Sequence, residues 1–326
     1  MTRISQFGFV TMVAVCAAAP LAAESNWDLP LAWPAENYIS LNAGIFAEEI
    51  ATATDGDINI TVHPGGSLGF KGPEMFSAVR DGLVPIGDML LQQQVGDEPI
   101  LGLQSLPYLM NTYEEQVAFQ EFYRPVLEEV FAENNQKLLY TIPWPQQQVW
   151  TKKEINSIDD FADIKVRSSD PSATQIFGAA GMTPVQLPWG EVIPSLATGA
   201  IEAVGTSSPS AVDGSFWEFL THGYPTRHTW NLDAMSVNLD TWNGLSEDQQ
   251  AAIIEVATRL EPVFWQSAQD ADAAQMKRLA AEGMILGDLD DATRAELSKR
   301  AAPIRDAEIE KMGDRAAAVV EAFAQR

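Results

Sequence analysis

The chain of 326 residues contains one cysteine, Cys16, and only three histidines. Because Cys16 lies in an N-terminal segment with the features of a cleaved leader, the remaining chain is expected to form no disulfide and no thiolate metal site. The histidines show no metal-ligand spacing, and neither a P-loop nor a dinucleotide-binding glycine motif is present. We therefore expect no metal and no cofactor.

Basic residues are also scarce, since 20 Lys and Arg stand against 45 Asp and Glu, for a formal net charge of −25. A chain this acidic is repelled by nucleic acid and by anionic lipid, and it has no basic patch to offset that repulsion. Beyond the first residues no apolar run is long enough to cross a bilayer. The sequence thus predicts no nucleic-acid partner and no direct membrane insertion.

Residues 1–23 have the pattern of a secretory signal peptide. Arg3 supplies positive charge, residues 7–19 form a short apolar run, and residues 21–23 offer a cleavage site of small residues. A lipid anchor on Cys16 is the alternative, but Val15 stands where such anchors have a small residue. We expect cleavage after Ala23 and a periplasmic mature chain.

Strand and helix patterns alternate along the chain, which predicts an α/β protein. The first strands are expected over residues 27–31, 58–62, 85–91 and 137–142, with a helix over 113–133, and we expect these strands to be parallel. A long helix is predicted from Ser246 to Glu282, because Ser246 and Gln249 form a capping box and Gly283 ends the pattern.

The length of the chain and a proline-rich stretch at residues 143–148 favour two domains joined by hinge strands. We expect domain I to comprise residues 24–144 and 233–272, and domain II to comprise residues 145–232 and 273–326. The predicted fold is a two-domain, periplasmic-binding-protein-like α/β fold in which the long helix spans both domains.

One arginine stands out as a candidate ligand-binding residue. Arg167 ends a predicted strand and is followed by a polar turn and a helix that starts at Pro171. In open α/β sheets ligands bind outside such strand ends, and a guanidinium offers two parallel donors to a carboxylate. The alternative is a surface arginine paired with Asp163 or Asp170.

Several tryptophans lie beside proline, glycine or polar residues, where they suit the lining of a pocket as well as core packing. Trp189 is the strongest candidate, because Pro188 and Gly190 hold it in a loop where an apolar ring is costly to expose.

The order of these landmarks resembles the solute-binding proteins of tripartite ATP-independent periplasmic (TRAP) transporters, the DctP-like family. The likeness covers nearly the whole mature chain. It is carried by the loop 64–69, the helix end 80–82, and the segments 106–109, 158–167, 181–185, 189–192 and 197–203.

The resemblance implies a protein that captures a ligand and hands it to membrane subunits of the transporter, rather than an enzyme. It also implies that Arg167 forms a bidentate salt bridge with a ligand carboxylate and that Trp189 packs on the ligand body. Thr206 stands where many relatives carry an asparagine. Phe70, Leu90 and Gln147 replace polar or charged contacts of sugar-acid-binding relatives.

These replacements predict a pocket for a small organic acid with an aromatic or apolar body, held between Trp189 and either Trp33 or Trp144. A second hypothesis in the same class is a cationic or zwitterionic osmolyte in a tryptophan cage, with Glu36 or Asp88 as its counter-charge.

A remote alternative is a secreted serine hydrolase. Residues 65–69 match the spacing of a nucleophile elbow around Ser67, and His222 and His228 follow in the order that a triad would need. Against this, several residues separate Ser67 from the next predicted helix, whereas an elbow turns directly into its helix.

Overall fold

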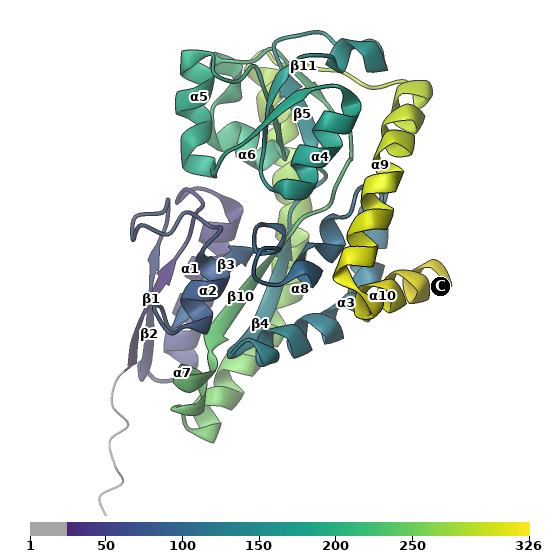
Figure 1. The fold of residues 1–326 in the computed structure, drawn as a ribbon. Helices are drawn as coiled ribbons and strands as arrows, with labels where there is room; N and C mark the ends of the chain where they lie inside the picture. The colour runs from purple at the N-terminus through teal and green to yellow at the C-terminus, as the bar shows by residue number, and fades with distance from the viewer. Residues whose placement is uncertain (1–24) are drawn as a thin grey trace, which may run out of the picture.

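The structure is a computed structural model that describes residues 25–326, so the predicted signal peptide and Cys16 lie outside the described residues. Two α/β lobes are stacked one above the other (Figure 1). The lower lobe in that view, here the first lobe, contains the N-terminal strands, and the upper, second lobe contains the middle of the chain.

The first lobe is built on two small sheets. One pairs strands β1 and β2 in parallel, and the other has the order β3-β10-β4. Its strands are β1 (Ser25–Pro30), β2 (Ile58–His63), β3 (Ile86–Leu90), β4 (Gln136–Pro143) and β10 (Leu232–Asn238), and its helices are α1 (Tyr38–Ala53), α2 (Met75–Arg80), α3 (Tyr113–Glu133) and α7 (Leu239–Asn243).

The expectation of parallel strands is wrong for this second sheet. Strand β10 returns from the other lobe, inserts between β3 and β4, and pairs antiparallel with both. The reason is topological: the chain leaves the first lobe after β4 and re-enters it along β10, so the strand that completes the sheet runs in the opposite direction.

The second lobe contains one six-stranded mixed sheet in the order β11-β9-β5-β8-β6-β7. Its strands are β5 (Gln148–Thr151), β6 (Lys165–Ser168), β7 (Thr183–Gln186), β8 (Ala203–Thr206), β9 (His222–Tyr224) and β11 (Ile285–Leu286), and its helices are α4 (Pro171–Ala180), α5 (Val192–Thr198) and α6 (Ser208–Asp213).

The long helix is confirmed as α8 (Glu247–Ala281), and it begins at the predicted capping box of Ser246 and Gln249. It runs from the first lobe into the second (Figure 1). Its residues Ile253 and Phe264 belong to a first-lobe core, whereas Leu279 near its end packs in a second-lobe core. Burial at both ends makes α8 a brace between the lobes.

Two further helices follow. Helix α9 (Asp291–Met312) packs against α4 of the second lobe and against a 3₁₀ helix of the first, Pro99–Ser105. Helix α10 (Asp314–Ala324), which the sequence-based division assigns to domain II, packs against α3 of the first lobe. The residue boundaries of the two domains stay a proposal.

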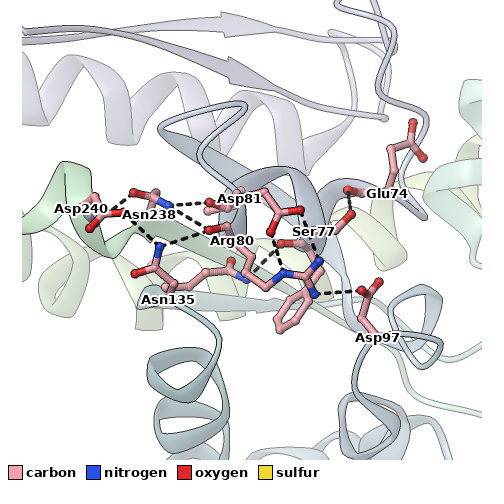
Figure 2. A network of polar contacts seen from close by, with 11 residues as sticks. Glu74, Ser77, Arg80, Asp81, Asp97, Asn135, Asn238 and Asp240 are labelled. Atoms are coloured by element: carbon pink, nitrogen blue, oxygen red, sulfur yellow. Dashed lines mark hydrogen bonds and ion pairs between the residues drawn. The ribbon is translucent and has the colours of Figure 1, made fainter.

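The far end of the first lobe is joined by a polar network (Figure 2). The side chain of Asn238 caps α7 and also donates to the Val79 and Arg80 carbonyls at the end of α2. Arg80 pairs with Asp81 and Asp97. These bonds satisfy helix-end groups that would otherwise lack partners, and they fix α2 against β10.

The two segments that connect the lobes lie side by side. The Trp144 amide donates to the Asn231 carbonyl at 2.9 Å, and the Gln147 amide donates to the Thr229 carbonyl at 3.3 Å. The predicted crossing at residues 143–148 therefore runs beside a return crossing, and the residues of both segments face the space between the lobes.

Candidate ligand-binding site

A pocket lies between the two lobes and encloses about 300 Å³ of empty space, part of it open to solvent. This size is at the small end of ligand pockets. Seven of the eight residues nominated from the sequence line it, together with three that were not. The lining consists of Trp33, Leu90, Trp144, Gln147, Arg167, Ser169, Trp189, Thr206, Ser210 and Asn231.

Phe70 is the nominated residue that does not line this pocket. Its ring is partly buried against the first-lobe core that contains Met75 and Phe76. An apolar side chain in a loop gains more from an existing core than from a small polar pocket, and the sequence does not reveal which of the two lies within reach.

Three lining residues were missed by the sequence reasoning. Ser169 belongs to the polar turn after β6, which the reasoning noted only as a turn. Ser210 lies on α6, directly after the strand end at Thr206. Asn231 precedes β10 in the return crossing. Their common signal is position, since each lies at a strand end or in a hinge segment.

Arg167 lies on β6 and is 3% exposed. Its Nε donates to the Leu187 carbonyl at 2.9 Å and its Nη1 to the Gly205 carbonyl at 3.4 Å. Among residues 25–326 no acidic side chain lies within 4.0 Å of the guanidinium, so the surface pair with Asp163 or Asp170 is not formed.

Burial lowers the pKa of Arg167 to about 10, and the charge of Asp170 opposes this shift. Arg167 is therefore still a cation at neutral pH. Two backbone carbonyls hold the guanidinium in place without neutralising it. A buried cation of this kind gains stability when an anion enters the pocket.

Trp189 begins a short 3₁₀ helix, Trp189–Glu191, and is partly buried. It packs against the first-lobe core around Trp33 and against the second-lobe core around Phe216. The Arg167 guanidinium lies 6.0 Å from the centre of its ring. Trp189 thus contacts both lobes and places an aromatic face beside the cation.

The first-lobe side of the pocket is aromatic. Trp33 and Trp144 meet edge to face with ring centres 4.8 Å apart. Both indole N–H groups point away from bulk water and donate to buried carboxylates, which belong to Asp88 and Asp233. Their apolar surfaces therefore remain available to the pocket.

The hinge residues add polar groups to the lining. The Gln147 side chain is buried and donates to the Pro145 carbonyl at 3.0 Å. Asn231 is 4% exposed, and its side-chain oxygen has no hydrogen-bond partner. A buried acceptor without a donor is costly, so a ligand N–H group at this point would be stabilised.

The geometry does not support the hydrolase alternative. Ser67 is exposed in a turn, and α2 begins only at Met75. The His222 and His228 rings are hydrogen-bonded to Thr221 and Thr226 respectively, and within the described chain neither contacts Ser67. A triad needs hydrogen-bond contact between nucleophile and base.

The two counter-charges named for an osmolyte do not line the pocket. Glu36 is exposed, and Asp88 is buried behind Trp33. Within residues 25–326 no group of three His, Cys, Asp or Glu side chains is arranged to hold a metal ion. In the same part of the chain, no helix combines the length and apolarity of a membrane span.

A larger hollow of about 760 Å³ lies beside Trp144 and is lined by residues of α8 and the hinge. Its charged lining residues are Arg227, which is exposed, and Asp272, which accepts a hydrogen bond from Ser208. This hollow lacks a buried charge that awaits a partner. The smaller pocket around Arg167 is therefore the better candidate.

Known proteins share this architecture. The chain is 25% identical to the ectoine/5-hydroxyectoine-binding periplasmic protein UehA of Ruegeria pomeroyi, over 97% of this chain and 94% of that protein. A TRAP solute-binding protein from a marine metagenome, specific for pyroglutamate, is 32% identical with a TM-score of 0.88, covering 93% of this chain and all of that one.

A further solved structure is DctP6 of Bordetella pertussis, an extracytoplasmic solute receptor binding pyroglutamic acid. It is 26% identical with a TM-score of 0.89, over 93% of this chain and 100% of that one. The family model DctP, described as bacterial extracellular solute-binding protein, family 7, matches residues 31–311. The chain therefore belongs to the DctP family, the solute-binding proteins of TRAP transporters.

Proposed function

We propose that this TRAP receptor captures a small carboxylate whose flat, largely apolar body lies between tryptophan rings. The observation that carries the proposal is the buried guanidinium of Arg167, which faces an inter-lobe pocket without an acidic partner. A ligand carboxylate supplies the missing negative charge, and its charge-assisted hydrogen bonds are the strongest that this pocket can form.

The rest of the lining decides the shape of the ligand. Trp33 and Trp144 on one side and Trp189 on the other leave a narrow space of about 300 Å³, which suits a small ring. The unpaired oxygen of Asn231 adds a place for a ligand N–H group. A five-membered lactam that carries a carboxylate has all these features.

The relatives support this choice. The marine protein that is 32% identical to this chain is specific for pyroglutamate, and DctP6 binds pyroglutamic acid. Pyroglutamate is a small lactam with one carboxylate. We therefore propose pyroglutamate, or an acid of the same size and shape, as the ligand.

A zwitterionic osmolyte is the second candidate, because UehA binds ectoine and 5-hydroxyectoine. Ectoine is also a small ring with a carboxylate, but its ring carries a positive charge. Asp88 and Asp233 behind the tryptophans favour such a charge over a neutral ring. The two candidates share the Arg167 contact and differ in what the tryptophan side prefers.

Thermal unfolding in the presence of each compound tests these candidates. A ligand at 100 times its Kd stabilises a protein by about 2.7 kcal/mol. We expect stabilisation by L-pyroglutamate, weaker stabilisation by benzoate, and none by glycine betaine. Stabilisation by ectoine or glycine betaine alone would replace the organic-acid proposal with the osmolyte proposal.

We further propose that the chain is a receptor without catalytic activity and that it is exported by its N-terminal segment. The family consists of substrate-binding receptors. Ester hydrolysis that disappears in Ser67→Ala would contradict the first point. A full-length mass for the protein recovered from the periplasm, without loss of residues 1–23, would contradict the second.

A further inference from the structure

Two buried acids lie directly behind the tryptophan side of the pocket. Asp88 on β3 is 3% exposed and Asp233 on β10 is fully buried. In the antiparallel pairing Asp88 stands opposite Met235, and Asp233 stands opposite Leu90. The two acids are therefore diagonal neighbours on one face of the sheet, the face that also carries the pocket residue Leu90.

Both acids accept hydrogen bonds from the pocket tryptophans. The Trp33 indole N–H lies 3.1 Å from Oδ1 of Asp88 and 2.7 Å from Oδ2 of Asp233. The Trp144 indole N–H lies 2.8 Å from Oδ1 of Asp233. Asp233 thus binds both rings at once, and Asp88 binds only Trp33.

We propose that Asp88 and Asp233 share one proton and act as positioning residues that fix the Trp33 and Trp144 rings for ligand contact. The word contact rests on the proposed function, whereas the pairing itself does not. Neither acid lines the pocket. They act on the ligand through the indoles.

One proton is what the contacts require. Two indole donors are best held by a carboxylate, so one acid stays ionised. A second negative charge beside it, in a site without water, would be strongly disfavoured. Burial, followed by the charge of Asp233, raises the pKa of Asp88 well above its usual range. Oδ2 of Asp88 has no other hydrogen-bond partner, as expected for the oxygen that carries the proton.

The surroundings supply no cation to replace that proton. The titratable groups that act on this region from the neighbouring elements are Tyr38 of α1, Tyr140 of β4, Asp213 of α6 and Asp272 of α8. All are acids or phenols. The Tyr38 hydroxyl donates to the Pro143 carbonyl at 2.6 Å and so is not a donor to the pair.

The two acids should respond differently to the same isosteric change. In Asp88→Asn the new carboxamide can donate to Asp233, as the protonated acid does, and can still accept from Trp33. In Asp233→Asn the charged acceptor of both rings is lost, and the new amide N–H group opposes an indole N–H. We expect the first variant to keep the tryptophan geometry and the second to lose it.

Spectroscopy of the ligand-free full mature chain tests the pairing independently of any ligand. The indole ¹⁵N–¹H resonances of Trp33 and Trp144 are assigned with Trp33→Phe and Trp144→Phe. We expect Asp233→Asn to move both resonances and Asp88→Asn to leave Trp144 in place. Infrared spectra at pH 7.5 should contain a protonated-carboxyl band that Asp88→Asn removes. Absence of that band, or equal effects of the two variants, would overturn the proposal.

Calorimetry with L-pyroglutamate tests the effect on binding. Loss of a charge-assisted hydrogen bond network predicts about tenfold to hundredfold weaker binding in Asp233→Asn and less than threefold in Asp88→Asn. The infrared result stands even if Asp233→Asn fails to fold. If wild type does not bind pyroglutamate, the proposed ligand is wrong, but the resonance and infrared outcomes still decide the pairing. Equal affinities of wild type and a folded Asp233→Asn would overturn the positioning role.

Discussion

The two sides of the pocket hold their charges in opposite ways. On the second-lobe side the charge of Arg167 faces the pocket and only neutral carbonyls hold it. On the first-lobe side the acids Asp88 and Asp233 stand behind Trp33 and Trp144, which separate them from the pocket. The cation can therefore meet a ligand, whereas the acids contact only protein.

This difference assigns a separate task to each lobe. The second lobe recognises charge, and the first lobe recognises shape. The ligand joins the two, because a carboxylate on Arg167 places the ligand body against the tryptophans of the other lobe. Closure of the lobes and capture of the ligand are then the same event.

Removing the exposed charge should have the largest effect. In Arg167→Met the apolar stem is kept and the guanidinium is lost. We expect at least hundredfold weaker binding of L-pyroglutamate by calorimetry, since a buried carboxylate without its partner costs about 3–5 kcal/mol. The thermal midpoint without ligand should stay the same or rise, because an unpaired buried charge has been removed.

Arg294→Ala is the matched control for this variant. Arg294 is also a partly buried arginine of the second-lobe region, but it is paired with Asp288 and lies outside the pocket. Its loss should leave affinity unchanged. If both variants bind pyroglutamate as wild type does, the assignment of charge recognition to the second lobe is wrong.

The contact that joins the two sides should respond to pH. The Asn37 side chain of the first lobe donates to Asp213 of the second at 2.6 Å, and burial raises the pKa of Asp213 from 3.8 to about 6. Between these values the folded chain holds a proton that the unfolded chain has lost. The free energy of unfolding should fall by about 2–3 kcal/mol as pH rises from 4 to 6.

Asp213→Asn isolates this effect, because a carboxamide resembles the protonated acid and can still accept from Asn37. Chemical denaturation at several pH values should find the variant more stable than wild type at pH 7, with no difference near pH 4. A difference between the two proteins that does not change with pH would contradict this account of the inter-lobe contact.

The aromatic ring on the charged side should matter less than the charge itself. Trp189→Phe keeps an aromatic face but reduces its area beside Arg167, and we expect about tenfold weaker binding of pyroglutamate. Trp217→Phe is matched, because Arg278 lies 5.3 Å from the Trp217 ring outside the pocket. Calorimetry that finds equal losses in both variants would remove Trp189 from the ligand contact.

Much of this arrangement follows from local sequence signals. The strand end at Arg167, the loop that holds Trp189 and the capping box at Ser246 are each written within a few residues, and the structure contains all three. Local chemistry suffices for such features because the groups that form them are neighbours along the chain.

The acid pair and the direction of β10 could not be read in that way. Asp88 and Asp233 are 145 positions apart by their numbers, and they meet only because β10 inserts between β3 and β4. Phe70 failed for a related reason, since the core that attracts its ring is assembled from distant helices. Long-range pairing decides these positions, and no local pattern encodes it.

The smallest expected effect separates general stability from either side of the pocket. Ser246→Ala removes the side-chain oxygen that accepts from the Gln249 amide at 3.2 Å, at the first-lobe end of α8. Loss of such a cap costs about 1 kcal/mol of the free energy of unfolding, measurable by chemical denaturation. Because the cap is far along the helix from the residues that line the pocket, pyroglutamate affinity should not change. A loss of affinity as large as that of Trp189→Phe would mean that both sides of the pocket depend on overall stability, and the division of tasks between the lobes would then fail.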